Sequence, residues 1–181
     1  MTAIVGLAAA GGRVLIGADS AASDGQSVIL RDDPKVFCAG SFVIGFTTSF
    51  RMGQILQHAM QPPEPKPGDS LYRFMVVEFV NVVRAALKEG GFAHVENGVE
   101  RGGAFLVGVR GRLFQVQDDF QVCEASARFD ACGSGEQIAL GSLATSAELS
   151  VDPHERVKLA LHAAAQFSAF VRPPFHIMEA M

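Results

Sequence analysis

The order of apolar segments along this chain is the feature that most constrains its fold. Short apolar runs typical of strands fill most of the first quarter, and two segments with the periodicity of amphipathic helices follow. A second group of strand-like runs, two more helical segments and a last strand complete the chain. Because each amphipathic helix must bury its apolar face, two helix pairs separated by strand groups predict two sheets packed face to face with helices outside each. We therefore expect an α+β fold, a four-layer αββα sandwich of two antiparallel sheets.

Glycine and proline mark where the elements begin and end. Ala10-Gly11-Gly12 predicts a hairpin between the first two strands, and Asp152 followed by Pro153 predicts the start of the last helix. The expected strands are 2–9, 13–19, 28–30, 35–39, 42–47, 104–109, 112–117, 120–125, 129–132 and 175–178. The expected helices are 48–61, 70–89, 133–149 and 152–170, and the segments 20–27 and 92–102 are expected to be polar loops.

Composition narrows the class of protein. The chain has 181 residues, of which 49% are hydrophobic and 19% charged, so we expect residues 1–181 to form a single domain. A net charge of -4 and the lack of a basic cluster argue against nucleic acid as a partner. No segment approaches the roughly 20 apolar residues of a membrane span, and the N-terminus does not read as a secretion signal. We expect a cytoplasmic protein that does not associate with membranes.

The sequence lacks the motifs of several common enzyme classes. The five histidines show no His-Glu-x-x-His spacing, and neither a Gly-x-Ser-x-Gly elbow nor a phosphate-binding Gly-Lys-Ser/Thr loop is present. Cys38, Cys123 and Cys132 lie far apart, which favours reduced thiols over disulfides. We expect neither a metal nor a cofactor.

Thr2 stands directly behind Met1 at the head of the first apolar run. A threonine with a free amino group carries a hydroxyl nucleophile and an α-amine on one residue, so it supplies both the attacking group and a base. Threonine is also an ordinary second residue and an ordinary strand residue. Thr2 is therefore a candidate nucleophile only if other residues place suitable charged groups beside it.

Asp19 and Lys35 are the candidates for these charged groups. Asp19 ends the second expected strand, and Lys35 begins a strand sixteen positions later. Hairpin geometry brings both beside Thr2, where an ammonium disfavours protonation of the threonine amine and a carboxylate keeps that ammonium charged. Each residue also has a plain interpretation, as a turn residue or as a charge at a sheet edge.

Taken together, these segments resemble the β-type subunits of the proteasome and, in particular, the bacterial HslV-type peptidase, which are N-terminal nucleophile hydrolases. The resemblance covers nearly the whole chain. It rests on residues 2–7, 14–19, 33–37 and 133–135 and on the closing strand at 175–176.

The resemblance implies a role for each matching residue. Thr2 is the expected nucleophile after removal of Met1, Lys35 tunes its amine, Asp19 pairs with Lys35, and Ser134 is a hydroxyl near the amine. Ser23 matches a residue whose backbone lines the substrate, and Thr47 falls where the family usually has a glycine whose N–H faces the oxyanion. Homo-oligomeric rings, a peptide or unfolded-protein substrate and an ATP-dependent unfoldase are the expected partners.

The sequence departs from the family near the end of the last long helix. The family carries an aspartate and a serine there, whereas residues 166–170 supply only Ser168. This departure leaves a ring-forming scaffold or binding subunit without activity as an alternative to a threonine peptidase. A small-amide hydrolase on the same fold is a third possibility.

Overall fold

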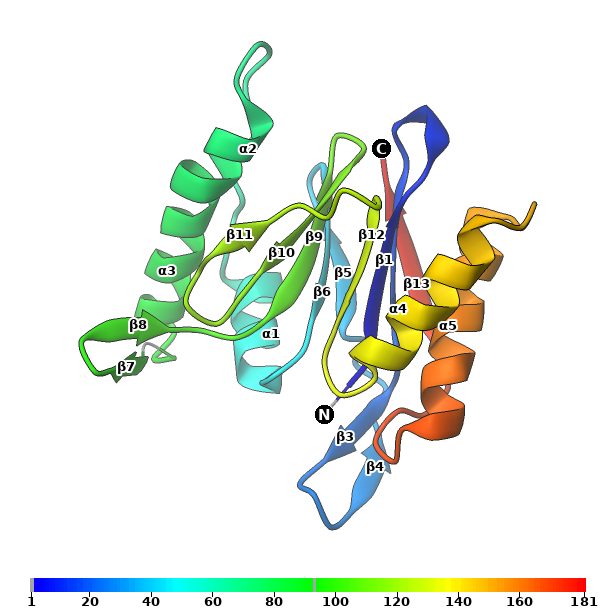
Figure 1. Cartoon of the computed structure of the whole chain (residues 1–181). Helices are drawn as coiled ribbons and strands as arrows, with labels where there is room; N and C mark the ends of the chain where they lie inside the picture. Colours follow the sequence, from blue (N-terminus) through cyan, green and yellow to red (C-terminus); the bar gives the residue numbers. More distant parts are fainter. Residues whose placement is uncertain (1, 93) are drawn as a thin grey trace.

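The computed structural model describes residues 2–92 and 94–181, and two antiparallel sheets lie face to face at its centre (Figure 1). The first sheet has the strand order β12-β1-β2-β13, and the second has the order β11-β10-β9-β6-β5. The first consists of β1 (Ile4–Ala8), β2 (Val14–Ala18), β12 (Phe129–Cys132) and β13 (His176–Ala180). The second consists of β5 (Val36–Ala39), β6 (Phe42–Phe46), β9 (Phe105–Val109), β10 (Arg112–Val116) and β11 (Val122–Cys123).

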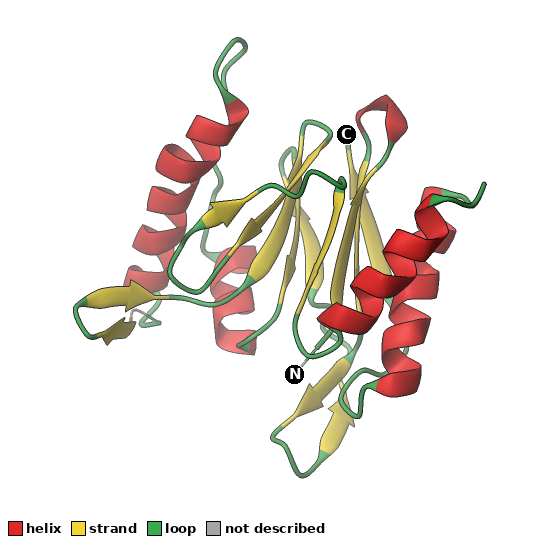
Figure 2. Ribbon diagram, viewed as in Figure 1, coloured by secondary structure: helices red, strands yellow, loops and turns green. Residues whose placement is uncertain are grey.

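Helices cover the outer face of each sheet (Figure 2). On the first sheet lie α4 (Glu136–Ala147) and α5 (Pro153–Phe167), and on the second lie α1 (Phe50–His58) and a longer helix. The longer helix joins α2 (Leu71–Phe74), the π-helical segment η2 (Met75–Phe79) and α3 (Val80–Glu89). The expected α+β fold of four layers is confirmed.

Apolar side chains fill all three spaces between the layers. One cluster lies between the two sheets and includes Ile4, Ile16, Val43 and Leu106, and a separate cluster lies under each helix layer. The sheets approach closely at Gly108, which has no side chain. A Cβ on this residue would lie 2.5 Å from Val14. A larger residue at that position would force the two sheets apart.

Strand pairing brings distant residues to one end of the sandwich. In the middle of the first sheet, Ile4 of β1 pairs with Ala18 of β2 on one side and with Cys132 of β12 on the other. Thr2 therefore lies beside Asp19, which follows β2, and beside the turn that follows β12. Lys35 directly precedes β5 in the facing sheet.

The structure differs from the expected elements at two hairpins. Residues 20–27, expected as a loop, include β3 (Ala21–Ser23), which pairs with β4 (Val28–Leu30). In the segment 92–102, expected as a loop, β7 (His94–Glu96) pairs with β8 (Val99–Arg101). Both hairpins turn on an Asp-Gly or Asn-Gly pair, which favours tight turns between strands.

Smaller differences concern the ends of elements. The last helix ends at Phe167 rather than near residue 170, and the strand expected at 120–125 shortens to β11. A short turn of 3-10 helix, η1 (Ala10–Gly12), joins β1 to β2 where a plain hairpin turn was expected. In residues 2–92 and 94–181, no helix has the length and apolar character required to cross a membrane.

Candidate active site

The hydroxyl of Thr2 contacts a buried ammonium group. The Lys35 Nζ donates a hydrogen bond of 2.7 Å to Thr2 Oγ1 and another of 2.7 Å to Asp19 Oδ1. The side chains of Lys35 and Asp19 are only 2% and 0% exposed. The structure thus brings Thr2, Lys35 and Asp19 together, as the sequence predicts.

Main-chain groups hold the Asp19 carboxylate in place. Its Oδ1 accepts from the Ala3 N–H at 3.1 Å, and its Oδ2 accepts from the Ala21 N–H at 3.0 Å and the Arg172 N–H at 3.2 Å. A buried carboxylate is stable in its charged form when hydrogen-bond donors and a cation surround it. Sequence reasoning missed these three donors because a main-chain N–H leaves no signature in the residue type.

Burial changes the acidity of Lys35. Removal of the ammonium from water lowers its pKa below the ordinary value, and the nearby Arg31 guanidinium acts in the same direction. The Asp19 carboxylate opposes this shift through its charge and its hydrogen bond. Burial and Asp19 therefore shift the pKa of Lys35 in opposite directions, and the ammonium lies directly beside the Thr2 hydroxyl.

Ser134 lies on the main-chain side of Thr2, in the turn between β12 and α4. The Thr2 nitrogen donates to Ser134 Oγ at 3.1 Å, and the Thr2 carbonyl accepts from Ser134 Oγ at 3.3 Å and from the Gly135 N–H at 3.2 Å. Gly133 makes this turn possible, since it has a φ of 97° and a Cβ there would lie 2.3 Å from the Thr2 oxygen. The turn fixes both main-chain groups of Thr2.

A small cavity opens beside these groups. It has a volume of about 70 Å³ and is lined by Thr2, Ser23, Lys35, Phe46, Thr47, Thr48, Ser49 and Phe50. Ser23 and Thr47, the residues predicted to contact substrate, both belong to this lining. The structure therefore places every predicted site residue at one end of the sandwich.

The main chain of Thr47 does not have the predicted orientation. Its N–H donates to the Ala104 carbonyl at 3.1 Å as part of the sheet, so this donor is already used. The next residue, Thr48, has a φ of 73°, and the Ser49 N–H closes a tight turn onto the Thr47 carbonyl at 2.9 Å. In the part of the chain that the structure describes, the Thr48 N–H has no hydrogen-bond acceptor.

Two further predictions concern residues around the amine. Ser168, the remaining serine of the pair expected near the end of α5, accepts weakly from the Phe170 N–H at 3.5 Å, and its carbonyl accepts from Arg172. Over residues 2–92 and 94–181, none of its hydrogen bonds reaches Thr2 or Ser134. Met1 lies outside the described residues, so its removal stays a prediction.

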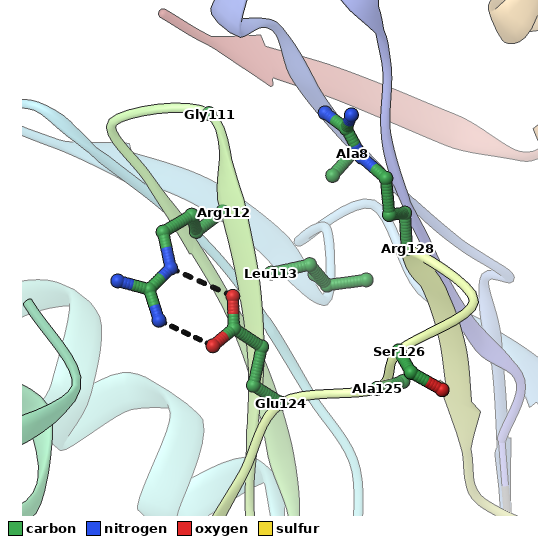
Figure 3. Close-up of a pocket in the computed structure, with 8 residues that line it drawn as sticks. All are labelled: Ala8, Gly111, Arg112, Leu113, Glu124, Ala125, Ser126 and Arg128. Atoms are coloured by element: carbon green, nitrogen blue, oxygen red, sulfur yellow. Dashed lines mark hydrogen bonds and ion pairs between the residues drawn. The ribbon is translucent and has the colours of Figure 1, made fainter.

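A larger groove lies at the opposite end of β1, where Ala8 is located (Figure 3). It has a volume of about 450 Å³ and is open to solvent, and Arg112 and Glu124 form a two-pronged ion pair beside it. Arg128 turns toward β1 and donates to the Ala9 carbonyl at 3.2 Å. In the described residues, no cluster of three or more histidine, cysteine or acidic side chains could bind a metal.

The four-layer sandwich and the placement of Thr2 at the head of a central strand correspond to a known class. The chain has the N-terminal nucleophile hydrolase fold of the HslV and proteasome type. The structure is similar to that of BPH from Thiobacillus denitrificans in complex with Epoxomicin, with 25% sequence identity and a TM-score of 0.80. That match covers 98% of this chain and 97% of that chain.

Two other solved structures share the fold at lower identity. Eukaryotic HslV from Trypanosoma brucei is 16% identical with a TM-score of 0.69, over 98% of both chains. The Anbu (Gly-1) mutant from Hyphomicrobium sp. strain MC1 is 18% identical with a TM-score of 0.65, over 98% of this chain and 80% of that chain. No protein-family model and no curated protein matches the sequence. The predicted resemblance is confirmed at the level of the fold.

Proposed function

We propose that this chain is a threonine-type endopeptidase subunit of a ring assembly, with Thr2 as the nucleophile once Met1 is removed. The observation that carries the proposal is the Lys35 ammonium, buried and 2.7 Å from both Thr2 Oγ1 and Asp19 Oδ1. A buried charge of this kind reduces stability unless it is fully paired, and here its second partner is the candidate nucleophile.

The mechanism uses both functional groups of Thr2. Once Met1 is removed, the nitrogen that donates to Ser134 is an α-amine, and it accepts the proton of the Thr2 hydroxyl. Oγ1 attacks the scissile carbonyl carbon while the Lys35 ammonium stabilises the charge on the oxygen. The C–N bond then breaks, the amine delivers its proton to the leaving nitrogen, and water hydrolyses the resulting ester to release Thr2.

The developing negative charge on the carbonyl oxygen needs a donor, and we assign this role to the Thr48 N–H. Thr48 lines the same cavity as Thr2, whereas the Thr47 N–H is engaged with Ala104. A main-chain N–H without an acceptor, held in a constrained turn, is suited to an oxyanion that forms only during the reaction.

The ring assembly follows from the resemblance to HslV-type peptidases. Three consecutive apolar residues of β4 support it, because Val28, Ile29 and Leu30 are 41%, 61% and 59% exposed. In such an assembly the substrate is an unfolded protein or peptide, delivered by an ATP-dependent unfoldase in the cytoplasm. Native mass measurement tests the assembly, and a monomer at micromolar concentration contradicts it.

The nucleophile is tested by covalent labelling. An epoxyketone probe should add to the wild-type chain at Thr2, and intact-mass measurement followed by peptide mapping locates the adduct. Thr2→Ala should not be labelled, while Thr2→Ser keeps a hydroxyl and should be labelled more slowly. Equal labelling of wild type and Thr2→Ala, or retention of Met1 in the protein purified from its native host, would refute the proposal.

A further inference from the structure

The cavity beside Thr2 is bounded by two aromatic rings. The rings of Phe46 and Phe50 meet edge to face, with centroids 6.1 Å apart and an angle of 86° between their planes. Phe46 is the last residue of β6, and Phe50 is the first residue of α1. The two rings therefore form a wall where the strand turns into the helix.

The Phe46 ring has a fixed position. A Cβ on Gly53 would lie 2.1 Å from atoms of this ring, so only a glycine one turn into α1 leaves room for it. Phe46 is 4% exposed and belongs to the core cluster beneath the helices. This side of the wall cannot withdraw to admit a larger group without repacking of the core.

Arg31 packs against the Phe50 ring. The Arg31 guanidinium carbon lies 4.1 Å from the centroid of the ring, within the range of a favourable cation–π contact. Asp33 fixes Arg31 through two hydrogen bonds of 2.7 and 2.6 Å, and the Arg31 N–H donates to the Ser20 carbonyl at 3.0 Å. Phe50 is only partly buried, so the stack on Arg31 and the edge contact with Phe46 are the contacts that hold its ring.

The remaining volume limits what reaches Thr2. At about 10–15 Å³ for each water-sized group, a cavity of about 70 Å³ accommodates roughly five to seven such groups. The reacting carbonyl carbon, its oxygen and the neighbouring Cα must occupy part of this space. Two closely packed rings beside a pocket of this size leave more room for a short side chain, such as alanine, serine or threonine, than for an aromatic ring.

We infer that Phe46 and Phe50 restrict cleavage to peptide bonds that follow a small residue, and that Arg31 and Asp33 are positioning residues which hold the Phe50 ring in place. The inference rests on the proposed function, since it concerns the substrate of the same site. It names the substrate class as unfolded segments rich in small residues.

Two fluorogenic peptides that differ only in the residue before the scissile bond, alanine or phenylalanine, test this inference. The wild-type protein should cleave the alanine peptide with a kcat/KM on the order of 10² higher. Phe50→Ala should raise the ratio of phenylalanine to alanine cleavage by about ten-fold or more, because it removes half of the wall. Arg31→Met keeps the length of the side chain without its charge, and should raise the ratio by a smaller factor.

Tyr72→Ala is the matched control, because this aromatic residue is 47% exposed on α2 and does not line the cavity. Its ratio should equal that of the wild type. Phe50→Leu serves as a second opening variant with less risk to folding. Equal cleavage of both peptides by the wild-type protein, or an unchanged ratio in both Phe50 variants, overturns the inference.

Labelling of Thr2 separates the two proposals. If an epoxyketone with alanine next to the reactive group labels all variants while the ratios do not change, the size restriction is wrong and the peptidase proposal stands. If no variant is labelled and neither peptide is cleaved, the proposed function fails and the inference fails with it.

Discussion

At one end of β1, Thr2 lines a cavity of about 70 Å³, and at the other end Ala8 lines a groove of about 450 Å³. The Lys35 and Asp19 side chains at the small cavity are 2% and 0% exposed. At the large groove, the Arg112 and Glu124 side chains are 38% and 31% exposed. Both ends therefore hold an ion pair, and the two pairs differ mainly in their contact with water.

The comparison teaches that burial matters more than volume in locating chemistry on this fold. An exposed ion pair contributes little to stability, because water solvates both partners well when they separate. A buried pair has no such alternative, so its geometry is fixed and its charge acts at full strength on whatever lies beside it. Here Thr2 lies beside it. The larger groove has volume but no reactive group under comparable influence.

The largest contrast is expected when the cation is removed from each end. Lys35→Met leaves the Asp19 carboxylate buried without its partner, and should lower the free energy of unfolding by about 3–5 kcal/mol and abolish peptide cleavage. Arg112→Met should lower it by less than about 1 kcal/mol, without loss of cleavage. Urea denaturation and a peptidase assay measure both. The comparison breaks if the two substitutions have equal effects on stability.

The next contrast concerns adjacent main-chain groups of the small cavity. An ester in place of the amide at position 48 removes the Thr48 N–H, and should lower kcat by about 10² to 10³ with little change in Tm. An ester at position 47 removes a hydrogen bond of the sheet, and should lower Tm while kcat is largely kept. A large loss of kcat with the ester at position 47 and little loss with the ester at position 48 would assign the oxyanion contact to the Thr47 N–H.

A third contrast uses two glycines that both have a positive φ, one at each end of the sandwich. Gly12 has a φ of 78° with nothing near its missing Cβ, whereas at Gly133 the Cβ would meet the Thr2 oxygen at 2.3 Å. Gly12→Ala should lower the free energy of unfolding by about 1–2 kcal/mol through backbone strain alone. Gly133→Ala should have a larger effect and also slow the labelling of Thr2. Similar values for both would mean that the turn tolerates a side chain.

The smallest effect is expected at the large groove. Glu124→Gln removes the charge of the exposed pair with Arg112 and keeps the shape of the side chain. The free energy of unfolding should change by less than about 1 kcal/mol, and cleavage should not change. A large loss of cleavage after this substitution would contradict this prediction and would show that the groove contributes to activity.

Much of the fold followed from the sequence because the apolar pattern and the turn signals agreed. The order of strands and helices predicted both sheets and both helix layers, and it placed Asp19 and Lys35 beside Thr2. The two missed hairpins had a signal of their own. Asp24-Gly25 and Asn97-Gly98 are turn pairs between short strands. The run before the first pair, Ala21–Ser23, has no β-branched residue to mark a strand, and charged residues at 96, 100 and 101 obscured the alternation around the second.

The sequence predicted the parts of the candidate site that side chains form. It did not predict the parts that main-chain groups form. Thr2, Asp19, Lys35 and Ser134 have residue types that suggest their roles. Among the described residues the Thr48 N–H has no acceptor, because the Thr47 N–H donates to Ala104 instead. That choice of partner depends on the register between β6 and β9. The Arg31 stack on Phe50 joins two segments whose contact is set by tertiary packing.

The three donors to Asp19 come from Ala3 just before β1, from β3 and from the segment after α5. The Arg172 donor lies 153 residues along the chain from the carboxylate. A nascent chain still emerging from the ribosome cannot supply that last donor. The Lys35 and Asp19 pair therefore reaches its final environment only when the segment after α5 has been synthesised and has docked beside Asp19. For the proposed peptidase, this dependence would keep the nucleophile from being fully assembled while its own chain is still unfolded.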